Sequence, residues 1–299
     1  MKVSRSPRPA FTLVELMVSI GVLSLLILLI TQLFNSASLT VTGSQKRLDA
    51  DGIARTVFDR MSSDFETIVK RPDVDYDFNK QTGNDSMYFY AESSGYPSSS
   101  ATGASTVSLV GYRINDHFQM ERLGQRLAWN GTNGVVFLTY PNGGPTPNPS
   151  GTIAQNFSSV INETDPTSSN YYYDVIGDGV FRMEFCFQLR DGSFSNVPYL
   201  SPNTTANGLS DVAAAVVAIA VMDPSSKHSV PVNGGNIPQF ETAADLLADF
   251  IPSGSQPVLM AKQWNNDWIA SIGSNTTGLP AMAASQVRIY QRFFYLNTR

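Results

Sequence analysis

Side chains that could carry out catalysis or bind a metal are few in this sequence of 299 residues. The two histidines, His117 and His228, lie far apart, and no cysteine or histidine spacing typical of a zinc site occurs. There is also no G-x-S-x-G nucleophile motif and no phosphate-binding glycine loop. We therefore expect both histidines to be surface or turn residues, and we expect no enzyme activity, metal or cofactor.

Cys186 is the only cysteine in the chain. It cannot form an internal disulfide or a cysteine-based metal site, and no histidine lies near it in the sequence to activate it. It belongs to residues 180–190, where apolar and polar residues alternate, and it falls on the polar side. We expect a solvent-facing or half-covered thiol and not a nucleophile.

Two groups of acidic residues partly match metal-binding loops. Residues 73–77, DVDYD, have the alternation that begins a calcium loop, but Phe78 replaces the required glycine and Asn84 replaces the bidentate glutamate. Asp174 and Asp178 surround a glycine in a pattern that also suits a turn. We interpret the first group as a solvated acidic loop and the second as turn residues.

Aromatic residues gather at positions 171–173, which are three consecutive tyrosines, and at Trp264 and Trp268. Exposed aromatic clusters can bind sugars or partner proteins. The sequence favours the alternative that these side chains fill the core of a domain with few long aliphatic residues.

These groups are positioned by the secondary-structure elements of the chain, and the first of these elements is an apolar segment near the amino terminus. Residues 1–10, MKVSRSPRPA, carry three basic residues and no acidic one. Residues 11–30 contain a single charge, Glu15, and as a helix would span about 30 Å, the thickness of a bilayer core. The charge distribution predicts a cytoplasmic amino terminus and an extracytoplasmic chain after about residue 35. Glu15 is unusual, because a carboxylate in a spanning helix is costly unless it stays hydrated at headgroup depth or finds a partner.

Residues 8–16, RPAFTLVEL, resemble the class III signal of type IV prepilins and type II secretion pseudopilins. In that family a dedicated peptidase cuts just before the phenylalanine and methylates the new amine. The resemblance implies cleavage between Ala10 and Phe11, N-methylation of Phe11, and an assembly role for Glu15, which would pair with the amine of a neighbouring subunit. Ala10 departs from the family, which nearly always has glycine there, but a small residue still fits and we expect processing.

Two other interpretations of the apolar segment stay open. One is an ordinary secretory signal cut near residues 36–38, where small residues occur, and the other is an uncut membrane anchor. The apolar run is longer than the roughly 7–15 residues of an ordinary signal core, and a glutamate interrupts it. The identity of the mature amino terminus distinguishes the three interpretations.

The helix is expected to continue beyond the membrane, because no proline occurs between Pro9 and Pro72. Apolar residues recur along one face and require a packing partner. They are Ile53, Val57, Met61 and Phe65, with Phe58, Ile68 and Val69 widening the stripe. Gly43 predicts a break or bend, and Arg71-Pro72 is expected to end the helix.

After Pro72 the pattern predicts antiparallel strands separated by turn residues. We expect strands at residues 87–90, 107–114, 118–120, 135–140, 180–190, 193–197, 212–222 and 287–296, and a short helix at residues 241–250. In residues 180–190, Phe181 should lie on the same face as Met183 and Phe185, and an Asp-Gly turn should follow. The small residues of segment 212–222 would let a helix pack closely against them.

Parts of this domain resemble particular prepilin-type proteins. The order of helix and strands, residues 179–185 before the Asp-Gly turn, and the later Ala/Val strand resemble J-type minor pseudopilins and W-type minor pilins. Residues 288–296 resemble the end of the Verru_Chthon cassette family of prepilin-type proteins.

Charge argues against nucleic acid as a partner, because the formal net charge is −5 and no basic block occurs outside the first ten residues. Loss of residues 1–10 would remove Lys2, Arg5 and Arg8 and change the formal net charge from −5 to −8.

Together these observations predict an α+β fold, in which a long amino-terminal helix, half transmembrane and half amphipathic, packs on an antiparallel β-rich head. The expected regions are a leader (1–10), a transmembrane helix (11–34), an extracytoplasmic half-helix (35–71) and a head domain (72–299). The predicted function is a minor pilin or pseudopilin in the bacterial inner membrane, single-pass with a cytoplasmic amino terminus. Its expected partners are the prepilin peptidase/methyltransferase, other pilin or pseudopilin subunits and inner-membrane lipid. The alternative is a membrane-tethered adhesin or ligand-binding module displayed through the same signal.

Overall fold

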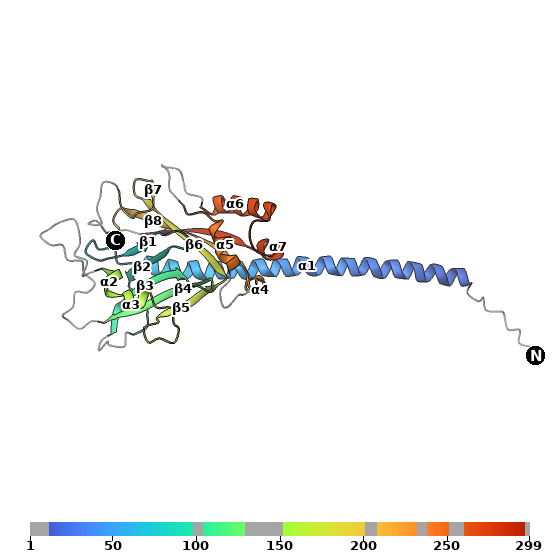
Figure 1. Ribbon diagram of the computed structural model, residues 1–299, viewed down its shortest axis with the longest axis horizontal. Coiled ribbons are helices and arrows are strands. Elements are labelled where there is room, and N and C mark those ends of the chain that lie inside the picture. Colours follow the sequence, from blue (N-terminus) through green and yellow to red (C-terminus); the bar gives the residue numbers. More distant parts are fainter. Residues whose placement is uncertain are drawn as a thin grey trace, which may run out of the picture. The chain divides into compact units, whose positions relative to one another are not determined.

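The computed structural model describes residues 12–97, 104–128, 152–200, 208–231, 238–250 and 260–296. The chain divides into two compact units, Met1–Gln45 and Lys46–Arg299. The first unit contains the beginning of one long helix. The second contains the end of that helix, two antiparallel sheets and several short helices (Figure 1). The α+β fold predicted from the sequence is confirmed.

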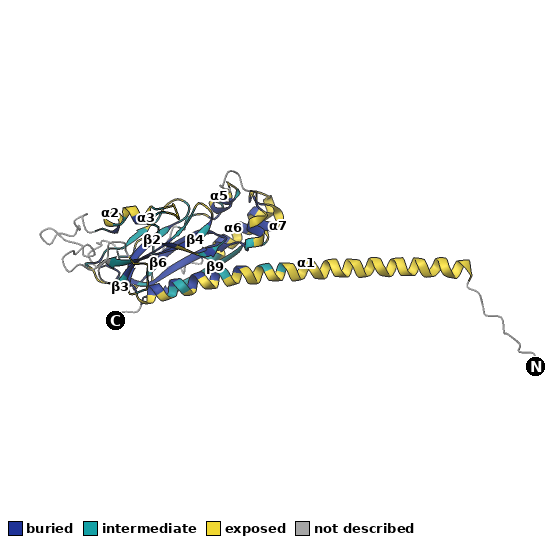
Figure 2. Cartoon of the chain, turned by 90° about the horizontal axis from the view of Figure 1, so that it is seen from below, coloured by how far each residue is buried: buried dark blue, intermediate teal, exposed yellow. Residues whose placement is uncertain are grey.

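Helix α1, Leu13–Glu66, has 54 residues. Its residues up to position 42 are exposed, whereas the face beyond position 50 is buried, and Figure 2 shows this change along the helix. The buried residues are Ala50, Ala54, Val57, Phe58, Met61, Asp64 and Phe65. The predicted apolar stripe is therefore confirmed, because it packs into the core of the second unit.

Two predictions about α1 were wrong, the break or bend at Gly43 and the end at Arg71-Pro72. The helix passes through Gly43 without a break, since a single glycine costs only about 1 kcal/mol and the residues around it continue the helix. It also ends at Glu66 and not at Arg71. Ile68 instead forms an isolated bridge with Ala91, so the chain after the helix pairs with a sheet.

The first sheet has the strand order β1-β2-β3-β4-β5, with every pair antiparallel. Its strands are β1 (Asp77–Asn79), β2 (Ser86–Ala91), β3 (Ala104–Ile114), β4 (Gln119–Ala128) and β5 (Tyr173–Asp178). The predicted strand at 87–90 and the predicted pairing of 107–114 with 118–120 are confirmed. The strand β4 is much longer than predicted, and the predicted strand 135–140 lies outside the described residues.

The second sheet has the order β7-β6-β8-β9 and is also antiparallel. Its strands are β6 (Val180–Leu189), β7 (Phe194–Ser195), β8 (Val212–Val221) and β9 (Arg288–Tyr295). The predicted strands at 180–190, 212–222 and 287–296 are confirmed. The Asp-Gly turn is confirmed as well, with Gly192 at φ 86° and the Asp191 carboxylate accepting from the Ser193 amide at 2.9 Å.

Short helices complete the second unit. They are α2 (Ile153–Asn156), α3 (Ser158–Ile161), α4 (Pro224–His228), α5 (Pro238–Asp245), α6 (Met260–Ser274) and α7 (Ala281–Ala284). The helix predicted at 241–250 is α5, which begins and ends earlier than expected. The small face of β8, including Ala218 and Ala220, packs with Trp264 and Trp268 of α6, as its composition predicted.

The prediction for β6 was wrong at two positions. The register between β6 and β8 shifts between Val180 and Arg182, and this bulge turns Phe181 away from Met183 and into the core beneath α5 and α6. Cys186 was expected to be at least half exposed, but it has no exposed surface. The physical reason is that helices cover the face of β6 that its alternation marked as polar.

Candidate functional site

The candidate functional site is the start of α1, where Thr12 and Glu15 form a capping box. Glu15 Oε2 accepts from both the amide and the hydroxyl of Thr12 at 2.9 Å, and the Thr12 Oγ1 accepts from the Glu15 amide at 3.2 Å. This reciprocal pattern satisfies two amides that a helix start would leave unpaired. The spacing T-x-x-E is the sequence signal of a capping box. The signal was missed because Glu15 was considered only as a charge within a membrane-spanning helix.

Ala10 and Phe11, the predicted processing and methylation positions, lie outside the described residues. Glu15 lies in the first turn of α1. Both of its bonds within the described part of the chain use the single oxygen Oε2, which leaves Oε1 for a donor from another molecule.

Three hydroxyl side chains in the apolar part of α1 donate to carbonyls of the helix itself. Ser19 Oγ donates to the Glu15 carbonyl at 2.6 Å, Ser24 to Ile20 at 2.8 Å and Thr31 to Ile27 at 2.8 Å. The side chains around them are exposed and apolar, among them Leu25, Leu28 and Ile30. By length and composition α1 can cross a membrane, and these internal bonds remove the cost of placing hydroxyls in lipid.

A buried ionic cluster fixes the second half of α1 to the first sheet. Asp64 of α1 forms a bidentate pair with Arg122 of β4, at 2.6 Å to Nε and 2.9 Å to Nη2. Its carboxylate also accepts from Tyr112 of β3 and from Ser93 at 2.7 Å. Burial alone would raise the pKa of Asp64, but its hydrogen bonds and the charge of Arg122 hold that pKa below its usual value.

A second buried cluster joins the two sheets. Lys80, after β1, donates to Asp85 at 2.5 Å and to Glu184 of β6 at 3.0 Å. Glu184 also accepts from the Phe250 amide at 2.9 Å, and Arg182 lies 3.5 Å from its other oxygen. Burial raises the pKa of Glu184 to about 7, partly offset by Lys80. No sequence spacing announced this cluster, because its members come from three distant segments.

The acidic residues singled out in the sequence do not gather. Asp73 pairs with Arg71 at 2.6 Å, and Asp75 accepts from the Ile153 amide at 2.6 Å. The interpretation of Asp174 and Asp178 as turn residues was wrong, since both lie in β5 and Asp178 pairs with Lys227 at 2.6 Å. Within the described ranges no three His, Cys, Asp or Glu residues come together as metal ligands.

Both histidines are exposed, as predicted: His117 lies in the turn between β3 and β4, and His228 ends α4. Trp264 and Trp268 are buried, so the prediction that they fill the core is confirmed. Among the three tyrosines, two are buried as well, and Tyr171 is half-buried.

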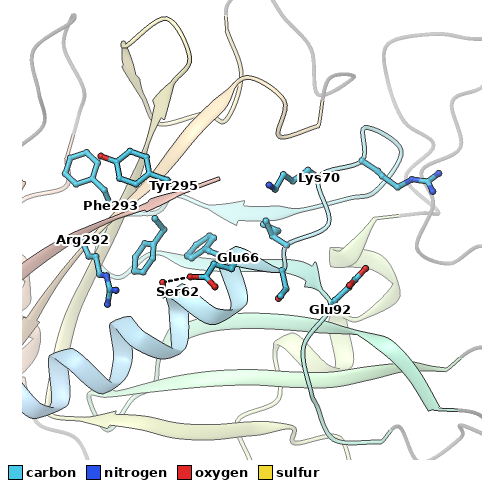
Figure 3. Close-up of a pocket in the computed structure, with 12 residues that line it drawn as sticks. Ser62, Glu66, Lys70, Glu92, Arg292, Phe293 and Tyr295 are labelled. Carbon is cyan, nitrogen blue, oxygen red and sulfur yellow. Dashed lines mark hydrogen bonds between the residues drawn. The ribbon is translucent and has the colours of Figure 1, made fainter. Parts of the chain in front are cut away.

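A groove of about 970 Å³ lies at the end of α1 (Figure 3). One wall is the last turn of the helix with Ser62 and Glu66, and the other is β9 with Arg292 and Tyr295. Figure 3 shows the cationic Lys70 and Arg292 and the anionic Glu66 and Glu92 around the groove, so its charge favours neither sign of ligand.

A long helix with an exposed apolar half and a half that packs on antiparallel sheet is the architecture of pilin-like proteins. Comparison with known families agrees at the amino terminus: residues 5–31 match the prokaryotic N-terminal methylation motif. This motif is typical of type IV pilins and pseudopilins, and it implies processing by a prepilin peptidase. No curated protein matches the chain, and the resemblance to J-type, W-type and Verru_Chthon proteins stays a prediction.

Proposed function

We propose that this protein is a structural subunit of a type IV pilus or a type II secretion-like pseudopilus. The observation that carries the proposal is the continuity between the methylation motif at residues 5–31 and α1, whose first half exposes an apolar surface all round. An exposed apolar helix needs lipid, or the same helix of neighbouring subunits, to cover it.

In this proposal the peptidase cuts between Ala10 and Phe11 and methylates Phe11. The protein lies in the bacterial inner membrane as a single-pass protein with a cytoplasmic amino terminus and an extracytoplasmic head, and then joins the filament. The predicted result is a mature chain that begins with N-methylated Phe11, which mass spectrometry of the protein from its native membrane measures. A chain that begins at Met1, or near residue 39, would contradict the proposal.

Glu15 is proposed to act in assembly through its second oxygen. Thr12 remains in the chain after cleavage before Phe11, so the capping box survives and continues to occupy Oε2. The methylated amine of a neighbouring subunit can then pair with Oε1 in the low-dielectric layer, where an unpaired charge is costly. Such a pair would set the axial register between subunits.

Three substitutions separate capping from assembly. Glu15→Ala and Glu15→Gln should leave cleavage intact but prevent incorporation into filaments, because both remove the charge. Thr12→Ala removes the cap, keeps the charge, and should be processed and incorporated. Immunoblots of sheared filaments and of membranes measure both steps. Normal incorporation of Glu15→Gln would refute the assembly role.

We further propose a minor role, near the tip or in initiation, because the unit Lys46–Arg299 is bulky for a subunit repeated along a shaft. Quantitative mass spectrometry of purified filaments should find this chain at a small fraction of the main subunit. If it were the most abundant component, the minor role would be wrong.

A further inference from the structure

A cavity of about 470 Å³ lies beside the turn between β3 and β4, a size suited to a small ligand. We call it the tyrosine pocket, and its walls come from Asn115, His117, Gln119, Tyr171 and Asp174. The proposed structural role of the protein makes no use of this pocket.

Tyr171 is held rigidly at the pocket. Its hydroxyl donates to Glu121 Oε1 at 2.7 Å, and its ring lies 5.6 Å from the ring of Tyr173. Tyr173 is itself buried and donates to the Ile161 carbonyl at 2.9 Å. Burial and Glu121 raise the pKa of Tyr171 to about 12, so its hydroxyl remains a donor at neutral pH. The half-buried ring of Tyr171 thus presents a fixed aromatic surface.

An ion pair behind the pocket supports this arrangement. Arg113 Nε donates to Glu121 Oε2 at 2.9 Å, and its guanidinium lies 3.7 Å from the centre of the Tyr173 ring. Glu121 also accepts from Asn115 at 2.7 Å. A buried ion pair adds little to stability compared with apolar packing. We therefore infer that the pair of Arg113 and Glu121 serves to hold Tyr171 in place.

The opening of the pocket carries acceptors. The carboxylates of Asp116 and Asp174 are both exposed, and Asp174 Oδ1 accepts from the Tyr96 hydroxyl at 2.6 Å. Because Arg113 and Glu121 neutralise each other, the two exposed carboxylates make the pocket acidic, and this disfavours an anionic ligand.

We propose that the tyrosine pocket binds a neutral saccharide. A sugar ring has a C–H face that can stack on a rigid tyrosine, and hydroxyl donors at its edge that suit the carboxylates of Asp116 and Asp174. The head would then bind a glycan in addition to its proposed structural role in the filament.

The test uses the full chain in a detergent without a sugar headgroup. Titration calorimetry would measure binding of neutral trisaccharides of glucose, mannose, galactose and N-acetylglucosamine. At least one should bind, and Tyr171→Ala should weaken it tenfold or more, which corresponds to about 1.4 kcal/mol. Tyr171→Phe keeps the ring and should bind within about threefold of the unchanged protein.

Tyr295→Ala is the matched control, because Tyr295 is an exposed tyrosine on β9 and should not affect binding. Thermal unfolding of each variant tests its folding. The proposal is overturned if no trisaccharide binds, or if Tyr171→Ala binds as well as the unchanged protein. A pentalysine peptide tests for simple attraction of cations to the acidic pocket, and binding of this peptide alone would also overturn the proposal. Filament incorporation of Tyr171→Ala should be normal, which separates this test from that of the structural role.

Discussion

At the scale of single residues, Asp64 shows how the second half of α1 is fixed to the head. The carboxylate has no exposed surface, and three side chains from the first sheet and its connections donate to it. Removing one partner of a buried ion pair leaves the other charge uncompensated, which costs about 3–5 kcal/mol.

Asp64→Asn is therefore expected to lower the free energy of unfolding by about 3–5 kcal/mol, measured by urea denaturation of the protein in detergent. Asp59→Asn is the control on the same helix, because its pair with Arg292 is exposed to solvent, which screens it, and its loss should have a much smaller effect. Replacing both partners, as Asp64→Leu with Arg122→Met, should recover most of the loss. Equal effects of Asp64→Asn and Asp59→Asn would contradict this view.

Gly179 and Gly192 have the same φ of 86°, so comparing an alanine at each position distinguishes the cost of backbone strain from the cost of crowding by neighbouring atoms. Gly192 has open space around it, whereas a Cβ at Gly179 would lie 2.2 Å from the Met222 carbonyl oxygen. Gly192→Ala should cost only the strain of a left-handed residue, about 1–2 kcal/mol. Gly179→Ala should cost about 4 kcal/mol or more, because the backbone of Met222 must move. Thermal unfolding of both variants checks this, and similar losses would show that the contact is relieved.

At the scale of elements, Glu184 connects β6 with the segment after β1 and with the Phe250 amide. It is faced by Lys80 and Arg182, and the carboxylates of Asp85 and Asp249 share these cations. Its pKa is raised to about 7 in the folded protein, so the folded state holds a proton there that the unfolded state has released. Stability from this group is present below about pH 4.5 and is lost as pH rises to about 7.

The free energy of unfolding should therefore fall by about 3 kcal/mol between pH 4.5 and pH 8 on account of Glu184. Glu184→Gln should flatten this slope, since the amide does not titrate. Glu163→Gln is the control: Ser168 lowers the pKa of this half-buried group, so its titration falls below this pH range. Urea denaturation across the range gives the slopes, and an unchanged slope in Glu184→Gln would refute the assignment.

The strands could be predicted from the alternation of apolar and polar residues, but the helices that cover the sheets could not. The strand at residues 180–190 was recognised because apolar residues recur at every second position, yet alternation cannot show that helices cover its second face. Helix α6 was missed because its burial rests on Trp264 and Trp268 among polar neighbours. The bulge at Phe181 depends on pairing with β8, which no local pattern contains.

At the amino terminus more could be predicted from the sequence, because the methylation motif and the apolar run are local signals. The order of leader charge, proposed cut site, Glu15 and apolar span could be read directly from the residues. The capping box was also readable, but the ion pair of Asp64 with Arg122 joins residues that are far apart in the chain.

At the scale of the whole molecule, the unit that begins at Lys46 should fold without the first part of the helix. The apolar residues of α1 that follow position 50 are buried within this unit, whereas those of the first unit are exposed. A fragment of residues 46–299 should be soluble without detergent and should unfold in one cooperative transition.

A fragment of residues 72–299 is the matched control. It lacks Val57, Met61 and Phe65, each of which contributes about 1.5–3 kcal/mol by burial, and should aggregate or fail to fold. Size-exclusion chromatography and thermal unfolding of the two fragments measure the difference. Equal behaviour of the two would show that the end of α1 is dispensable for the head.

The position of Cys186 gives the molecule an intrinsic reporter. It is the only cysteine, it lies on β6 and faces the layer formed by α5 and α6, and burial raises its pKa to about 12. A thiol-reactive dye can reach it only when the helical layer separates from the second sheet, because an enclosed thiol is neither accessible nor ionised. The rate of labelling in the unmodified protein would therefore measure how often this layer separates from the sheet.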